Sequence, residues 1–212
     1  MKHKFWPFLL LFLWMIFPVF AQETMVKTKD GKDVILNSDG TWKYANVNGE
    51  KSTEKEKNIN IDVSNLQFVK SSKIPFGVWL DPKVWESEKN DETEPSEFSF
   101  KLKGEEGYGL MVNEPVAIPL ESMKEIVVEN MKKAEAEDVK VNEEEDRVIN
   151  GLPVKYLQID AKVSKVPVNY MVYIYSGEDE TIQLFTYSFG KYFIKNRKQM
   201  ENLMNGLAKE AN

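Results

Sequence analysis

The chain has 212 residues, with 34 acidic against 28 basic side chains, a formal net charge of −6, no cysteine and one histidine, His3. Imidazole and thiol groups supply most nucleophile–base pairs and nearly all zinc and copper ligands, so this composition argues against most enzyme classes and against transition-metal sites. The acidic balance argues against nucleic acid and anionic membranes as partners, because binding phosphates needs a basic patch.

Residues 1–21 have the pattern of a secretory signal peptide. A short basic start, residues 2–4, precedes an almost wholly apolar run, residues 5–20. Val19 and Ala21 then place small residues at the −3 and −1 positions of a cleavage site. We therefore expect a protein that is exported to the periplasm or the extracellular space, with no stable membrane insertion after cleavage.

Cleavage after Ala21 is the first testable expectation. An uncleaved N-terminal anchor is the alternative, but the apolar run is shorter than the ~20 residues that a membrane span needs. Pro18 would also break the end of a helix there. The intact mass of the exported protein should lack residues 1–21, and a mass that includes them would show that the segment is an anchor.

Residues 22–44 are expected to form a small β module. Asp30-Gly31 and Asp39-Gly40 are strong turn dipeptides, and extended runs lie between and after them. Trp42 and Tyr44, in the last run, are candidates for a docking surface. The alternative is that these two rings close the small apolar cluster of the module itself.

Residues 45–61 are predicted to be a flexible linker. The segment is rich in Lys, Glu, Asn and Ser and has almost no apolar side chains. Such a segment cannot bury enough surface to offset the entropy cost of ordering it. It separates the β module from a main domain that spans residues 62–212.

The first half of the main domain reads as strands followed by a helix. Strands are expected at residues 76–80, which contain Trp79, at 97–103 and at 108–112, with an acidic loop over residues 86–97. A helix is expected over residues 119–135. Its apolar positions recur at spacings of three and four: Leu120, Met123, Val127, Met131 and Ala134.

The second half begins with a hairpin. Asn150-Gly151 lies between two long extended runs and favours a type I′ turn, because both residues tolerate positive φ. The runs 168–175 and 181–189 carry apolar or aromatic side chains on both faces, so they are expected at the centre of a sheet. A closing amphipathic helix starts near Lys191. Helices on both faces of antiparallel strands give an α+β fold, an α/β/α sandwich with a mostly antiparallel central sheet.

This order of elements resembles the Mog1/PsbP-like superfamily over the main domain. The local signals are the I-N-G-L-P hairpin turn, the aromatic strands NYMVYIYS and TIQLFTYSFG, and the closing helix. The string VKTKDGKDVILNSDGTWKY resembles a DGTW-type β module near the N-terminus of many exported bacterial proteins. The superfamily resemblance implies a non-enzymatic binding fold, used elsewhere to bind a small GTPase or to attach to a photosynthetic complex. No specific motif lines up, so no functional residue is carried over.

We therefore expect an exported, non-catalytic binding or accessory protein that docks to another envelope protein. The expected contact is a sheet edge or an aromatic surface around Trp79, Trp85 and Tyr108, with Trp42 and Tyr44 as further binding candidates. No catalytic residue, metal ligand or cofactor motif is assigned, since no glycine-rich phosphate loop or calcium loop occurs.

Two alternatives remain open from the sequence. A carboxylate-based hydrolase would use acidic clusters at residues 91–97 or 143–146, and it needs two facing carboxylates ~5 to 10 Å apart. A carrier of a small apolar ligand would need a closed pocket of ~300 Å³ or more. The shape of the surface and of any pocket therefore distinguishes protein docking, hydrolysis and the binding of a small apolar ligand.

Overall fold

The computed structural model describes residues 24–27, 33–36, 42–44 and 57–210. Contacts divide the chain into two compact units, residues 1–54 and residues 55–212. In the first unit, β1 (Thr24–Lys27), β2 (Asp33–Leu36) and β3 (Trp42–Tyr44) form an antiparallel sheet in the order β1-β2-β3. The two predicted turn dipeptides lie outside the described residues.

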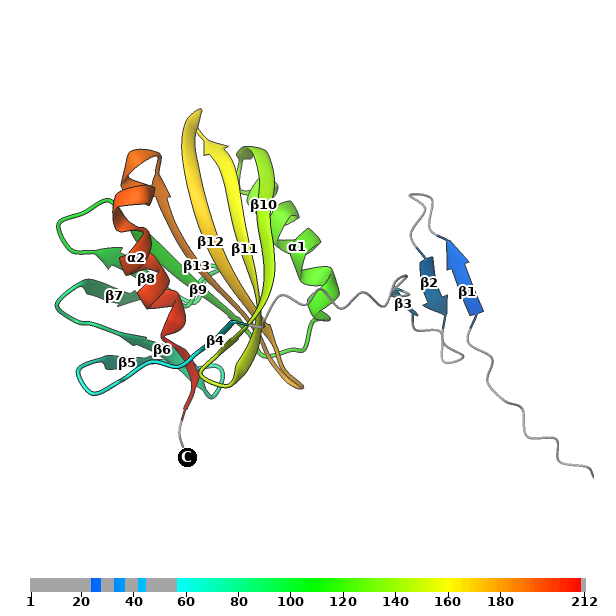
Figure 1. Cartoon of the computed structure of the whole chain (residues 1–212), viewed down its shortest axis with the longest axis horizontal. Helices are drawn as coiled ribbons and strands as arrows, with labels where there is room; N and C mark the ends of the chain where they lie inside the picture. Colours follow the sequence, from blue (N-terminus) through cyan, green and yellow to red (C-terminus); the bar gives the residue numbers. More distant parts are fainter. Residues whose placement is uncertain (1–23, 28–32, 37–41, 45–56, 211–212) are drawn as a thin grey trace, which may run out of the picture. The chain divides into compact units, whose positions relative to one another are not determined.

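The second unit is built around an eight-stranded sheet (Figure 1). The strand order is β4-β10-β11-β12-β13-β9-β8-β7, and every pair is antiparallel except β4 with β10. The strands are β4 (Lys57–Ile59), β7 (Trp85–Lys89), β8 (Phe98–Leu102), β9 (Tyr108–Glu114), β10 (Ala136–Ile149), β11 (Leu152–Val163), β12 (Val166–Ser176) and β13 (Thr181–Phe189).

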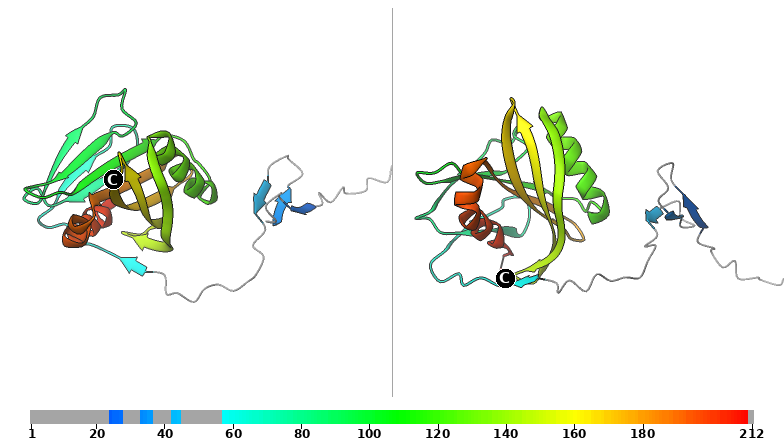
Figure 2. Two further views of the ribbon diagram at one scale, coloured as in Figure 1. Left: turned by 90° about the horizontal axis from the view of Figure 1, so that it is seen from above. Right: turned by 45° about the horizontal axis from the view of Figure 1, so that its top comes forward.

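A smaller antiparallel sheet and two helices complete this unit. The small sheet has the order β14-β6-β5, with β5 (Gln67–Lys70), β6 (Phe76–Leu80) and β14 (Leu207–Lys209). Helix α1 (Leu120–Lys133) lies on one face of the large sheet, and α2 (Lys191–Asn205) lies on the other (Figure 2). None of the helices among the described residues is both long and apolar enough to span a membrane.

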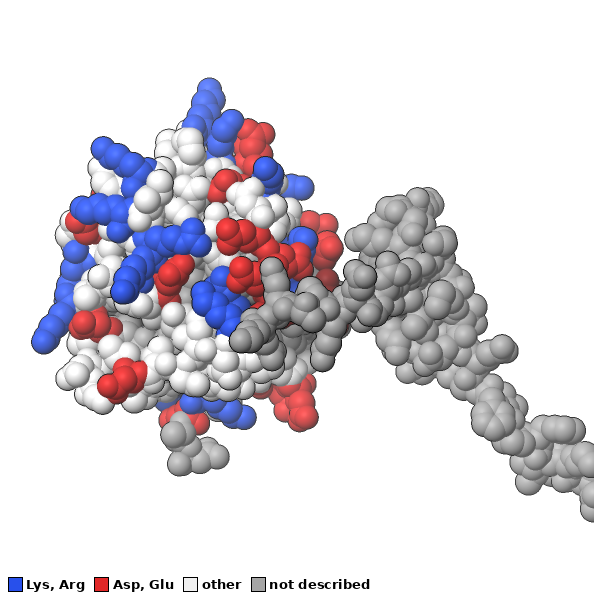
Figure 3. Space-filling model, in the orientation of Figure 1, with Lys and Arg blue, Asp and Glu red and all other residues white. Residues whose placement is uncertain are grey.

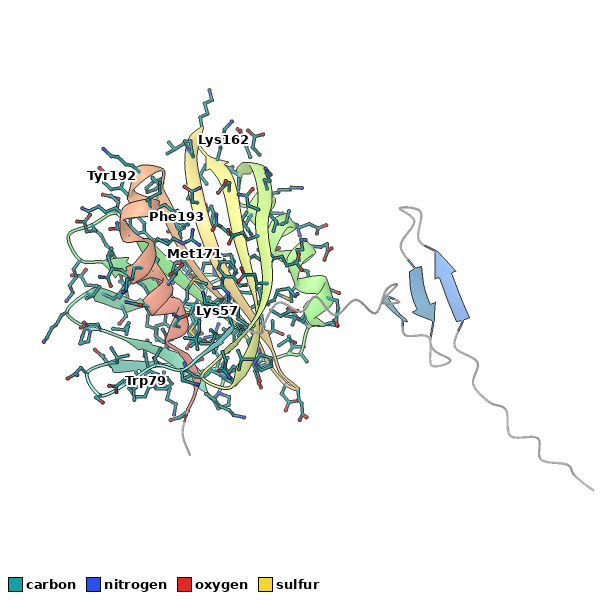
Figure 4. The ribbon with its side chains drawn as sticks, viewed as in Figure 1. Lys57, Trp79, Lys162, Met171, Tyr192 and Phe193 are labelled. Atoms are coloured by element: carbon teal, nitrogen blue, oxygen red, sulfur yellow. The ribbon has the colours of Figure 1, made fainter. Side chains whose placement is uncertain are left out.

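Two hydrophobic clusters hold these layers together. One packs α1 against β11 and β12, through Met123, Val127 and Val172 among others. The larger one packs α2 and the small sheet against the opposite face, where Phe193 of α2 and Met171 of β12 are both buried (Figure 4). The predicted α+β class with a large, mostly antiparallel sheet and a helix on each face is therefore confirmed, with the small sheet as an addition.

The predicted hairpin is present, and Asn150 also makes hydrogen bonds to other segments of the chain. Asn150 and Gly151 both have positive φ, 51° and 82°, as a type I′ turn requires. The Asn150 amide donates to the carbonyl oxygens of Asn205 and Leu207, each at 2.9 Å. Its side-chain oxygen accepts from the Ile61 N–H at 3.1 Å. The turn therefore anchors the end of α2 as well as reversing the chain.

Two sequence predictions are wrong in their boundaries. The predicted linker, residues 45–61, ends too late, because Lys57–Ile59 pairs with Arg147–Ile149 as strand β4; residues 45–56 lie outside the described part of the chain. The predicted acidic loop begins too early, because Trp85–Lys89 is an edge strand whose charged side chains face water. The strand predicted at 76–80 has its expected bounds, as β6, and it pairs in the small sheet.

Candidate functional site

One face of the large sheet is only partly covered by α1. Residues directly opposite each other on neighbouring strands point to the same face, so the pairing registers define rows across the sheet. One row is Glu86, Lys101, Tyr108, Tyr187, Tyr170 and Ile159. The next row is Glu88, Ser99, Leu110, Phe185, Val172 and Leu157.

Burial changes in the same way along both rows. At the β11–β12 end, Ile159, Leu157 and Val172 are fully buried and pack in the α1 cluster. The middle of each row, on β13 and β9, is partly buried and apolar or aromatic. We call the partly buried side chains of this region the open face: Tyr108, Leu110, Val112, Tyr170, Phe185, Tyr187 and Phe189. At the β7 end the side chains are charged and exposed.

Aromatic rings stack across the strands of the open face. The ring centroids of Tyr170 and Tyr187 are 5.4 Å apart, as are those of Tyr187 and Tyr108. Phe189 meets Tyr108 edge-on at 6.1 Å. Such pairs contribute roughly 0.5–1.5 kcal/mol each beyond the burial of area, so the rings form a firm, pre-arranged platform.

The hydroxyl groups of the platform stay protonated at neutral pH. The Tyr108 hydroxyl donates to Glu106 at 2.6 Å; this hydrogen bond, helped by burial, raises the pKa of Tyr108 to about 12. Burial, with a smaller effect from Tyr187, raises the pKa of Tyr170 to about 12. Burial also raises the pKa of Tyr187. The open face therefore offers neutral phenols, which are both hydrogen-bond donors and flat apolar surfaces.

An open hollow of about 560 Å³ adjoins the platform. Leu110 and Val112 of the open face form its apolar part, and residues 88–96 form its other wall. The Asn90 amide donates to the Ser96 hydroxyl at 2.8 Å, and the Ser99 hydroxyl donates to the Asn90 oxygen at 2.9 Å, so the loop is held in place. Carboxylates outnumber lysines on this wall: Glu88, Asp91 and Glu94 against Lys89.

Glu97 lies buried behind this loop, contrary to its predicted place in a solvated acidic segment. It is 3% exposed and accepts from the Ser71 hydroxyl at 2.6 Å, the Ser72 N–H at 2.7 Å, the Asn113 amide at 2.7 Å and the Ser72 hydroxyl at 2.8 Å. Burial acts to raise the pKa of the Glu97 carboxyl, but these hydrogen bonds outweigh it, so the pKa is lowered. Glu97 therefore stays ionised at neutral pH, and its hydrogen bonds link the small sheet to the large sheet.

The second acidic cluster, residues 143–146, lies on strand β10. Glu144 pairs with Lys124 and Lys155, and Glu145 accepts from Arg147 at 2.7 Å. Arg147 is buried, and its guanidinium lies 3.5 Å from the centre of the Tyr156 ring. The Glu144 ion pair therefore links β10 to α1, and the Arg147–Tyr156 contact lies on the α2 side of the sheet.

The two acidic clusters do not place a pair of buried carboxylates together among residues 57–210. Glu97 is the one buried acidic side chain among residues 57–210, and its lowered pKa suits neither a general acid nor a proton-sharing pair. No group of three or more His, Cys, Asp or Glu side chains in the described part of the chain is placed to hold a metal ion.

The structure separates the aromatic residues that the sequence grouped together. Trp79 and Trp85 line one cavity of about 280 Å³, with Asp62, Asp81, Gln199 and Asn202 among its other lining residues. Trp85 is only 3% exposed, and the half-buried Trp79 ring packs on Phe68 with centroids 4.8 Å apart. Tyr108 instead belongs to the open face. The structure therefore does not bring Trp79, Trp85 and Tyr108 into one surface, and a binding role for each stays a prediction.

Other candidate residues were missed or remain untested. Tyr170, Tyr187 and Phe189 were assigned to strands covered on both faces, yet they are half-exposed. The alternating aromatic residues of β13 could have indicated this surface. The sequence did not show how much of the sheet α1 covers, so it did not show which of these rings stay partly exposed. Trp42 and Tyr44 belong to β3, and their binding role stays a prediction.

Comparison with known proteins supports the fold and assigns no family. No family model and no curated protein matches the chain. Among solved structures, cyanobacterial PsbP (CyanoP) from Synechocystis sp. PCC 6803 is similar at 9% identity and a TM-score of 0.56, over 70% of this chain and 95% of that one. A Bacteroides thetaiotaomicron VPI-5482 protein is similar at 12% identity and a TM-score of 0.47, over 70% and 50% of the two chains. The CyanoP likeness shows that the chain has a PsbP-like fold.

Proposed function

We propose that this protein is an exported, non-catalytic accessory protein of the cell envelope that docks another protein through the open face. The observation that carries this proposal is a sheet face that α1 covers at its β11–β12 end, with Tyr170 and Phe185 packed at the margin of the α1 cluster, and that leaves the aromatic and apolar side chains over β13 and β9 only partly buried. The PsbP-like fold and the secretory pattern of residues 1–21 support it.

The open face has the composition of a protein-binding surface. Tyrosine is among the residue types enriched where interfaces gain most of their binding energy, because a ring buries a large area at a low entropy cost. Three tyrosines already stack in a row here, so their side chains would lose little further conformational entropy when a partner binds.

Site-specific photo-crosslinking in cells that export the protein tests this function. A photoreactive amino acid replaces Lys101, which is exposed and directly opposite Tyr108 in the first row. We expect one discrete crosslinked product containing an envelope protein. The matched control position is Lys162, an exposed lysine of β11 (Figure 4), which should give no such product.

Two results would contradict docking at the open face. One is equal crosslinking at positions 101 and 162, which would show random collision. The other is the absence of any product at 101 while the protein is exported and folded. Mass spectrometry of the product identifies the bound protein and the contacting segment.

A further inference from the structure

We propose that the occupant of the open face is an extended segment of the partner that contains prolines flanked by lysine or arginine. This inference rests on the proposed docking function and names the chemistry of the partner. Two features of the described residues carry it: the charge around the open face and the arrangement of its tyrosines.

The charge around the open face is predominantly negative. Glu86 and Glu88 lie at the β7 ends of the two rows, and Glu106 accepts from Tyr108. Asp91 and Glu94 line the adjoining hollow. The lysines near these carboxylates include Lys101 in the first row, Lys103 just after β8, and Lys89 in the hollow, so carboxylates remain in the majority. A basic segment is therefore favoured, whereas an acidic segment or a phosphate-rich ligand would be repelled.

We call the carboxylates around the open face, Glu86, Glu88, Asp91, Glu94 and Glu106, the acidic rim. The opposite side of the sheet has a different charge pattern. Helix α2 carries Lys191, Lys195, Arg197 and Lys198 against Glu201. Basic side chains gather around α2 in Figure 3. A basic segment is thus directed to the open face and away from the α2 side, because complementary charge steers the encounter as well as fixing orientation.

The tyrosine row fits proline better than other apolar residues. Grooves lined with aromatic rings recognise proline-rich segments, because a polyproline II helix is already extended and loses little entropy on binding. One polyproline turn of three residues advances about 9 Å. Consecutive rings of the row Tyr170–Tyr187–Tyr108 are 5.4 Å apart, so the row accommodates one such turn.

The phenol hydroxyls add a polar contact that suits this backbone. A polyproline II helix makes no internal hydrogen bonds, so its carbonyl oxygens are free to accept. Tyr108 and Tyr170 remain protonated donors far above neutral pH, with pKa values raised to about 12. The Tyr108 hydroxyl already donates to Glu106, which leaves Tyr170 and Tyr187 to donate to a bound segment.

Peptides of defined composition test the proposal on the whole chain. The probe is a fluorescent peptide of Lys-Pro-Pro repeats, with a Glu-Pro-Pro peptide and a Lys-Gly-Gly peptide of equal length as controls. We expect the Lys-Pro-Pro peptide to bind with a micromolar dissociation constant in fluorescence anisotropy. Each control should bind at least about tenfold more weakly, because it lacks either the charge or the proline.

Matched variants locate the binding. Tyr187→Ala should weaken binding of the Lys-Pro-Pro peptide about tenfold, whereas Tyr192→Ala, a half-exposed tyrosine on α2 (Figure 4), should leave it unchanged. Glu88→Lys should weaken it about tenfold, whereas Glu137→Lys, near the start of β10, should not. The two glutamate changes are on exposed side chains, so they test charge without disturbing the core.

The outcomes separate this inference from the proposed function. Equal binding of the Lys-Pro-Pro and Lys-Gly-Gly peptides, or binding that Tyr187→Ala does not change, would overturn the proline assignment. If no peptide binds but crosslinking at position 101 still captures one envelope protein, the docking function stands and the proposed segment chemistry is wrong. If neither occurs, both fail.

Discussion

Val172→Asp should abolish the cooperative unfolding transition of this protein. Val172 is fully buried on β12 beneath α1, with Leu157 and Phe185 directly opposite on the two neighbouring strands. A carboxylate at this position would have neither water nor a partner. The cost of several kcal/mol is comparable with the ~5–15 kcal/mol that stabilises a whole domain.

Lys101→Asp is the matched control for this prediction. Lys101 lies on β8, one strand from the sheet edge, and it is exposed. Its replacement by aspartate puts a like charge opposite Glu86, which should cost less than about 1 kcal/mol and move the melting midpoint only slightly. Thermal unfolding followed by circular dichroism measures both variants. Near-normal melting of Val172→Asp would show that the centre of the sheet has been assigned wrongly.

Glu97→Gln should lower the free energy of unfolding at pH 7 by about 1–3 kcal/mol. One Glu97 oxygen accepts from the Ser72 N–H and the other accepts from the Asn113 amide. Whichever end of the glutamine becomes the NH₂ group therefore faces another N–H donor. The link between the small sheet and the large sheet is weakened, although the side chain keeps its size.

The same variant should change how stability depends on pH. The folded-state pKa of Glu97 is lowered from its ordinary value, 4.5, so its stabilising effect is present above pH 4.5 and is lost as pH falls through the folded-state pKa. The unfolding free energies of the two proteins should therefore converge in acid. Urea unfolding between pH 7 and pH 3 measures this, with Glu88→Gln as an exposed control. A difference that stays constant with pH would contradict the role assigned to the Glu97 carboxylate.

Together these features separate the part of the molecule that holds the fold from the part available to a partner. Glu97, Arg147 and the two hydrophobic clusters join the layers. The open face instead keeps aromatic side chains half-exposed between α1 and an acidic rim. Substitutions on that face should therefore affect binding more than stability.

The sequence by itself determined the local elements of this protein. The spacing of Met123, Val127 and Met131 predicted α1, and those residues are its buried ones. Asn150-Gly151 predicted a type I′ turn, and the positive φ values of both residues agree. Apolar side chains on both faces of residues 168–175 and 181–189 predicted a central strand pair, which β12 and β13 form. These features follow from backbone preference and periodicity, which act between near neighbours in the chain.

Only the tertiary structure decided where the candidate site lies. Glu97 reads as one more acid of a solvated run until Ser71, 26 residues away, and Asn113, 16 residues away, enclose it. Trp85 and Tyr108 look alike in the sequence, yet one is in the core and the other is half-exposed. The extent of α1 over the sheet left Tyr187 only partly buried. Each outcome depends on which distant segments pack together, and neither periodicity nor composition encodes that pairing.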